Sequence, residues 1–233
     1  MHKYFILFNN KTNLDVETYI VSRPSKPSPK MEYEEVKVPG GKTLYRKKGY
    51  KDIEIPISFN FISKKPSEWG RDFRSIKKWL LRINDNKLKF SDDLEFYYKV
   101  NKVTIDTPER VLKRIGRFSV TFTCEPYDYL VEGLEEIELN NYLFNYYEHS
   151  QPIYKITGEG VLRLTVNGAE VTVNVGQNLT INTELGLCFR EDGSINNVAL
   201  KGRYKALELK EGDNTFSFNE GFDIKIIPNW RCL

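Results

Sequence analysis

The chain has 233 residues, a formal net charge of +3 and a hydrophobic share of 40%. This length allows one large β domain or two ordinary domains, each with its own core. The hydrophobic share excludes a disordered chain, and so small a charge surplus gives no argument for nucleic-acid binding, which needs a clustered basic patch. The 14 Tyr and 14 Phe, against 2 Met, favour strands over helices.

The three cysteines, Cys124, Cys188 and Cys232, fit no zinc-ligand spacing, and an odd number is a poor disulfide framework. Cys124 falls on the alternation of an apparent strand, where a thiol packs as a small hydrophobic group. We therefore expect the protein to fold in a reducing cytoplasm. The apolar run at residues 4–8 is too short for a signal peptide or a membrane span, so we expect no membrane partner.

The first expected strand covers residues 4–8, and a long irregular excursion follows at about 22–50. Pro24, Pro27 and Pro29 lie in its first part, and prolines at this spacing stop both helices and central strands. A long excursion within a compact domain is usually functional or disordered.

The stretch DIEIPISFNF, residues 52–61, alternates polar and apolar side chains over five periods. This alternation predicts a half-buried strand. Pro56 lies on its polar face and cannot donate to a neighbouring strand, so we expect a free edge or a bulge at that position.

One strong helix is predicted at about 68–83, with Ser67 as its cap. Its apolar face repeats at intervals of three and four residues, as an amphipathic helix requires. That face consists of Trp69, Phe73, Ile76, Leu80 and Ile83. Further strands are expected at 94–105 and 117–124, and Pro126 ends the second of them.

Basic residues gather at 46–51 and at 113–117. The simpler interpretation is that each run is the solvated tip of a hairpin. The alternative is an electrostatic contact with an acidic protein partner.

The second half of the sequence predicts short strands and no helix, which is typical of a β-sandwich or jelly roll. Asn167-Gly168, between alternating runs, predicts a tight hairpin. The segment LELKEGDNTFSF predicts a second hairpin, in which Leu207 and Leu209 face Phe216 and Phe218. We therefore expect a mainly β protein with an N-terminal β-sandwich-like domain at 1–135, a connecting segment at 136–149 and a C-terminal domain at 150–233.

Residues for catalysis are sparse, since the only histidines are His2 and His149 and no nucleophile elbow, metal-ligand motif or phosphate loop occurs. We expect no catalytic, cofactor-binding or metal-binding residues and no cofactor. Asp92-Asp93 is expected to form a turn rather than a metal site. A cell-wall hydrolase stays an alternative, because the separation of two catalytic carboxylates is set by the fold.

Several segments follow one another in a recognisable order. The first half contains RKKGYKDIEIPISF, an amphipathic helix, NDNKLKFSDDLEFYYKV and the run Gly116–Tyr129; the second contains SQPIYKITGEGVLRLTVNG, LKEGDNTFSF and IIPNWRCL. In this order they resemble the distal tail protein (Dit) family of long-tailed, non-contractile bacteriophages and prophages. The resemblance covers nearly the whole chain, and Gly116–Tyr129 is its most specific element.

The resemblance implies a structural protein of the virion tail, assembled in the cytoplasm of a bacterial host, and no enzyme. The N-terminal domain would form a homohexameric ring that continues the tail tube, and the C-terminal domain, similar to galectins, would project outward. Its partners would be the tail tube protein and the tail-tip or receptor-binding proteins. DNA would pass through the ring without specific binding, so we expect neither basic run to line the channel. A ring needs two different patches that meet, and the excursion at 22–50 is the expected source of one.

The alternative function is a carbohydrate-binding protein that recognises host cell-wall sugars through the C-terminal sandwich. A sugar site needs an exposed aromatic ring beside polar side chains. Candidates of the right type are Tyr204, Phe222 and Trp230, accompanied by Asn214 and Asn229. For each of them, packing in the core is the competing interpretation.

Overall fold

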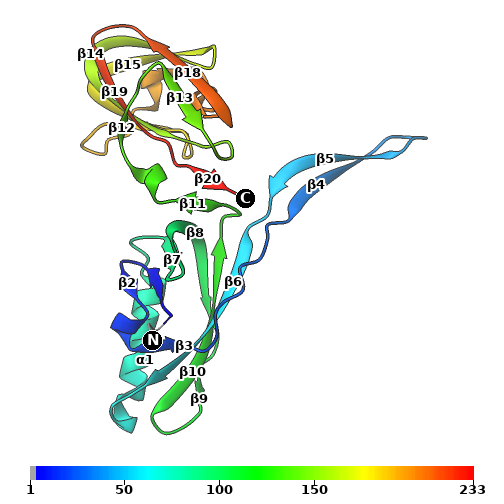
Figure 1. The fold of residues 1–233 in the computed structure, drawn as a ribbon, viewed down its shortest axis with the longest axis vertical. Helices are drawn as coiled ribbons and strands as arrows, with labels where there is room; N and C mark the ends of the chain where they lie inside the picture. Colours follow the sequence, from blue (N-terminus) through cyan, green and yellow to red (C-terminus); the bar gives the residue numbers. More distant parts are fainter. Residues whose placement is uncertain (1–3) are drawn as a thin grey trace. The chain divides into compact units, whose positions relative to one another are not determined.

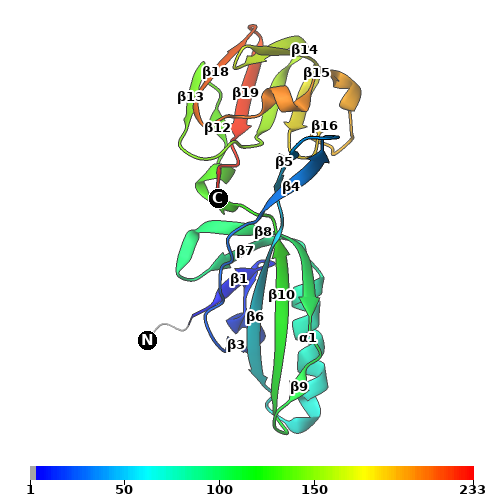
Figure 2. The ribbon, with the colours of Figure 1, turned by 90° about the vertical axis from the view of Figure 1, so that its right-hand side faces the viewer.

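The computed structural model describes residues 4–233, so His2 lies outside the described residues. The chain forms two compact units. The first ends at Asp128 and also holds Leu233, and the second spans Tyr129–Cys232. Both units are mainly β, as predicted, and the single α-helix of the described residues lies in the first unit (Figures 1 and 2).

The first unit is built on antiparallel strands in the order β2-β1-β7-β8-β10-β6-β3. The long strand β8 pairs with β7 through its first residues and with β10 through its last ones. It therefore joins the strands β2, β1 and β7 to the strands β10, β6 and β3. The bounds are β1 (Ile6–Phe8), β2 (Lys11–Thr12), β3 (Thr18–Ile20), β6 (Ile53–Ile62), β7 (Lys87–Phe90), β8 (Asp93–Ile105), β9 (Glu109–Arg110) and β10 (Ile115–Cys124).

Strand β6 confirms the predicted alternation, because its odd-numbered residues from Ile53 to Phe61 are buried. One edge of β6 pairs with β10 along its whole length. The other edge pairs with β3 only at Phe59 and beyond, apart from a bond from the Val21 nitrogen to the Ser58 oxygen. Pairing on that edge therefore stops before Pro56, which confirms the free edge that the proline predicts.

The helix α1 spans Trp69–Leu81 and follows a short 3-10 turn, η2 (Pro66–Glu68). Its buried residues, Phe73, Ile76, Trp79 and Leu80, pack into the core of the first unit. Of the predicted apolar face, Phe73, Ile76 and Leu80 are therefore confirmed as buried. Ile83 lies beyond the helix and is 37% exposed. Burial of side chains of this size contributes about 1.5–3 kcal/mol each.

The excursion at 22–50 is more regular than expected, because most of it is a β-hairpin. Strands β4 (Met31–Lys37) and β5 (Thr43–Tyr50) pair in antiparallel register. Gly40, at a φ of 70°, allows the tight turn between them. The prolines all lie before β4 or in the turn, where the missing N–H of proline removes no hydrogen bond between the strands. The expectation of an irregular excursion was therefore wrong for 31–50.

The second unit is a sandwich in which two long strands take part in both sheets. β14 (Ile153–Val166) and β15 (Ala169–Asn182) pair along their whole length. The main order of pairing is β12-β19-β14-β15-β16. β18 pairs with β13 and with the far end of β14, and β17 pairs with β15, which gives the second layer. β14 changes sheet at Gly158 and Gly160, whose φ values of 147° and 114° allow a sharp bend. The other bounds are β11 (Asp128–Leu130), β12 (Ile137–Glu138), β13 (Tyr142–Asn145), β16 (Leu187–Phe189), β17 (Leu200–Lys201), β18 (Gly212–Phe218), β19 (Phe222–Ile227) and β20 (Arg231–Cys232).

The segment at 136–149, expected to connect two domains, is part of this sandwich. Its strands β12 and β13 pair with β19 and β18 and form an edge of each sheet. The hairpin predicted at Asn167-Gly168 is confirmed: the two residues have φ values of 51° and 82° and join β14 to β15.

The hairpin predicted from LELKEGDNTFSF was wrong in its pairing. Leu207 ends a 3-10 turn, η5 (Tyr204–Leu207), and β18 pairs with β13 and β14 instead. The side chain of Asn214 bonds to both the nitrogen and the oxygen of Lys210, at 3.0 and 2.9 Å, and this holds the chain in a loop. Leu207 and Leu209 are nevertheless fully buried, as their apolar character predicts.

Two of the cysteines are buried, and none of the three forms a disulfide. Cys124 packs in the core of the first unit, as predicted, where burial raises the pKa of its thiol to about 12. Among residues 4–233, no helix is both long and apolar enough to cross a bilayer.

Candidate interaction surfaces

The hairpin of β4 and β5, which we call the arm (residues 31–50), pairs with no other strand of the described chain. It extends away from the sheets of the first unit (Figure 1). Large apolar side chains are exposed along it: Tyr33, Val36, Leu44 and Tyr45 are 50%, 43%, 57% and 64% exposed. An isolated two-stranded hairpin is at best marginally stable in water, so the arm gains stability when another surface covers it.

The register divides the arm into two faces. One carries Tyr33 and Tyr45, whose rings are in edge contact at 6.4 Å. The other carries Val36 opposite Leu44, beside the cross-strand pair of Glu34 and Arg46. Both faces therefore expose apolar contact area beside charged side chains.

The basic run at 46–51 lies along β5 and its end and not at a hairpin tip, which corrects the simpler expectation for this run. In contrast, the run at 113–117 follows the expectation, because it lies at the turn from β9 into β10. There, the guanidinium groups of Arg114 and Arg117 donate to Ser63 and Asn60 of the same unit, at 2.7 and 3.2 Å.

Asp92 lies in the turn from β7 into β8, as predicted, and Asp93 is the first residue of β8. Asp93 forms an ion pair with Lys26 at 2.9 Å, and Asp92 one with Arg23 at 3.8 Å. The two carboxylates therefore fix the chain that leads from β3 towards the arm. No group of three His, Cys, Asp or Glu side chains within residues 4–233 is arranged to hold a metal ion.

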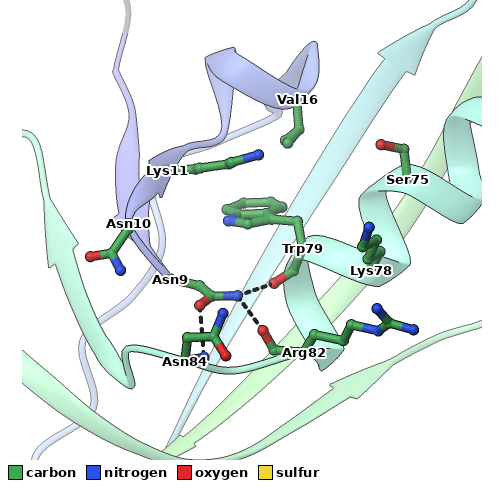
Figure 3. A pocket seen from close by; sticks show the side chains of 9 residues that line it. All are labelled: Asn9, Asn10, Lys11, Val16, Ser75, Lys78, Trp79, Arg82 and Asn84. Carbon is green, nitrogen blue, oxygen red and sulfur yellow. Dashed lines mark hydrogen bonds between the residues drawn. The ribbon is translucent and has the colours of Figure 1, made fainter.

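An open pocket of about 570 Å³ lies at the carboxyl end of α1 (Figure 3). Three cationic side chains line it, Lys11, Lys78 and Arg82, and its lining contains no carboxylate. A surface of this charge attracts acidic groups. Figure 3 also shows Asn9 pointing its amide at the end of the helix.

Asn9 closes the helix with one side chain. Its Nδ2 donates to the oxygens of Trp79 and Arg82, at 2.8 and 2.6 Å, and its Oδ1 accepts from the nitrogen of Asn84 at 2.9 Å. The last carbonyls of a helix have no partner within it, so these bonds explain why α1 stops at Leu81, two residues before the predicted end. No sequence signal pointed to Asn9, because it lies 70 residues from the groups it binds.

We expect the substitution Asn9→Ala to destabilise the first unit by about 2 kcal/mol more than Asn10→Ala does, because it leaves several polar groups without partners. The two residues are a matched pair: both have left-handed backbones, with φ values of 51° and 60°, so both variants carry the same backbone strain. Urea denaturation of the two variants measures the difference. Equal losses would show that the amide bonds of Asn9 add nothing.

Three of the residues predicted for sugar binding are buried. Trp230, Asn214 and Asn229 are 9%, 0% and 6% exposed. Asn229 donates to the oxygen of Gln151 at 2.8 Å, and Asn214 holds the loop at Lys210. The side chains of these three residues therefore serve the packing of the second unit.

Tyr204 is partly exposed, but its hydroxyl lies 3.4 Å from the sulfur of Cys188. Burial raises the pKa of this phenol, and the contact with the thiol adds to the effect. The Tyr204 hydroxyl contacts Cys188, whereas the Trp230 ring lies against Tyr147 and Asn229 donates to Gln151. Because Trp230, Asn214 and Asn229 are buried, the structure does not gather the predicted residues into one exposed group.

Exposed aromatic rings do gather elsewhere in the second unit. Tyr142, Phe144 and Tyr146, which we call the aromatic row, are 54%, 38% and 78% exposed. The sequence carried a signal for them, since the alternation in YLFNY, residues 142–146, places three aromatic residues on one face of a strand. The hydrogen bond from Tyr142 to Asp213 raises the pKa of the Tyr142 phenol.

No protein-family model and no curated protein sequence matches this chain. Solved structures do match its fold. The Dit protein of phage SPP1, described as a paradigm of the hub adsorption apparatus in phages that infect Gram-positive bacteria, superimposes with a TM-score of 0.69 at 11% identity, over 100% of both chains.

Two chains from the baseplate of phage P2 in its activated conformation are also similar. The calcium-bound structure gives a TM-score of 0.55 at 11% identity, over 100% of this chain and 99% of that one. The strontium-bound structure gives 0.52 at 12% identity, over 96% and 97%. At these identities the comparisons show that both units, in this order along one chain, have the fold of phage hub and baseplate proteins.

Proposed function

We propose that this chain is a structural component of a phage tail, a hub that joins the tail tube to the tail-tip or receptor-binding apparatus. The observation that carries the proposal is the match over the full length of both chains to the SPP1 Dit protein. A single β-sandwich occurs in many unrelated proteins, whereas two units matched end to end form a far more specific architecture. In this role the protein needs no catalytic group.

The hub is a homohexameric ring. Closed rings with a single kind of subunit require a heterologous interface, in which one patch meets a different patch on the neighbour. The arm is suited to be one of these patches, because its strands pair with no other strand among residues 4–233 and it exposes apolar side chains on both faces. The arm therefore reaches a neighbouring subunit, which covers Val36 and Leu44.

The centre of the ring is a channel through which DNA passes without being bound. Cationic side chains that face phosphates slow such passage, so the channel wall carries few of them. Two of the basic groups at 113–117 are already held by Ser63 and Asn60, and the run at 46–51 lies on the arm. Neither run faces the channel.

Electron microscopy of the purified protein, together with light scattering, tests this function. We expect a particle with six-fold symmetry, a central hole and six times the mass of one chain. A monomer at every concentration, alone and together with the tube protein of the same tail, contradicts the hub. A ring in which residues 46–51 or 113–117 point into the hole contradicts the channel, but leaves the hub intact.

A further inference from the structure

The aromatic row lies at strand β13, on an edge of the second unit, and its last member, Tyr146, follows the end of the strand. Strand β13 pairs with β18 on one side only. Asn145, the last residue of β13, is fully buried, whereas Tyr142, Phe144 and, just beyond the strand, Tyr146 are exposed. Three exposed aromatic side chains between residues 142 and 146 are unusual for a surface that meets only water.

The rings of the row are held in place without any ligand. Phe144 and Tyr146 are in contact, with ring centroids 4.6 Å apart and an interplanar angle of 59°. The hydroxyl of Tyr142 donates to Oδ1 of Asp213 at 2.5 Å. A ligand that binds here therefore meets ordered rings and does not have to immobilise them, which lowers the cost of binding.

Polar groups border the row directly. In the register of β13 with β18, Thr215 lies opposite Tyr142 and Asp213 lies opposite Phe144. Both β18 side chains are exposed on the face of the row. Oδ1 of Asp213 accepts from Tyr142, so Oδ2 keeps its capacity to accept from a ligand. The Thr215 hydroxyl can both donate and accept.

We propose that the aromatic row is a binding site for a neutral glycan, whose sugar rings stack on Tyr146 and Phe144 and whose hydroxyls bond to Asp213 and Thr215. A protein partner fits less well, because it would cover the Asp213 carboxylate in the middle of the row, and a buried charge needs compensation. Sugar hydroxyls supply that compensation as donors. An anionic polymer would be repelled by the same carboxylate.

The test measures binding of the full chain to an array of neutral linear hexasaccharides, with a polyphosphate-containing teichoic acid as the anionic probe. We expect binding to at least one neutral hexasaccharide and none to teichoic acid. The variant Tyr146→Ala is expected to weaken that binding about tenfold, the loss of one aromatic stacking contact. Tyr146 is 78% exposed, so its replacement is expected to leave the fold intact. A thermal melt of the variant checks this.

The matched control is Tyr45→Ala, which removes a tyrosine of similar exposure, 64%, from the arm. It is expected to leave glycan binding unchanged. The proposal is overturned if no neutral hexasaccharide binds, if teichoic acid binds more tightly, or if the two variants lose affinity equally. Tyr146 is not part of the arm, so the Tyr146→Ala variant should still assemble as the wild-type chain does. The result for glycan binding therefore does not depend on whether the protein forms the hub.

Discussion

The substitution Gly116→Val is expected to lower the free energy of unfolding of the first unit by about 3 kcal/mol, at the upper end of the range for overpacked cores. Gly116 lies opposite Phe61 in the pairing of β10 with β6, and the Phe61 ring folds over it. A Cβ at this position would overlap the ring, whose Cδ1 would be 2.9 Å away.

The Phe61 ring cannot move aside, because its own neighbours hold it. Its centroid lies 5.3 Å from that of Trp69, 5.8 Å from that of Phe73 and 6.1 Å from that of Phe118. A ring that covers a strand glycine compensates for the missing side chain. Any side chain at Gly116 therefore has to displace the junction of α1 with the sheet.

Urea denaturation followed by circular dichroism measures this loss, and Gly70→Ala is the control. Gly70 is in α1, where a Cβ would meet only the Nη1 of Arg74, at 3.6 Å. Alanine is the better helix former, so this variant is expected to be more stable than the wild type, by roughly 0.5–1 kcal/mol. If Gly116→Val unfolds at the wild-type urea concentration, the packing argument is wrong.

Removal of the arm is expected to leave a folded chain that no longer forms a ring. The Lys51 nitrogen donates to the Lys30 oxygen at 2.9 Å, so the two ends of the arm already face each other. An Asn-Gly pair in place of residues 31–50 can therefore close the chain with a short hairpin turn. The core of the first unit contains no residue of the arm, and the deletion removes the edge contact of the Tyr50 ring with Tyr127, so the stability of the unit should change little.

Light scattering and electron microscopy compare this variant with the wild type. The point variant Leu44→Asp should weaken the ring in the same direction, because it places a charge on the apolar face of the arm. Lys42→Ser, in the turn of the arm, is the control and should assemble normally. A six-fold ring formed by the chain without its arm would place the subunit interface elsewhere.

Local patterns predicted most elements of the fold. The alternation at 52–61, the apolar face of α1 and the Asn167-Gly168 turn each depend on neighbouring residues only, and all three are confirmed. The free edge at Pro56 is also confirmed. Proline has no backbone N–H to donate, and this limits strand pairing in any tertiary structure.

The errors concern pairing and burial. Leu207 and Leu209 are in the core, but the sequence could not show that β18 pairs with β13 and β14. The aromatic residues chosen for sugar binding were of the right chemical type, yet Trp230 is buried, whereas Tyr142, Phe144 and Tyr146 are exposed. Aromatic character does not distinguish a core residue from a surface one.

The sequence by itself determined the class of the protein: mainly β, with one amphipathic helix, hairpins at defined turns and no recognisable catalytic motif. These properties follow from the period of side chains along the backbone and from turn chemistry, which act over a few residues. Only the tertiary structure decided that Asn9 ends the helix, that Phe61 requires a glycine at 116 and that the arm and the aromatic row stay exposed. Those contacts join residues far apart in the chain, so their partners are set by how the sheets close and not by local pattern.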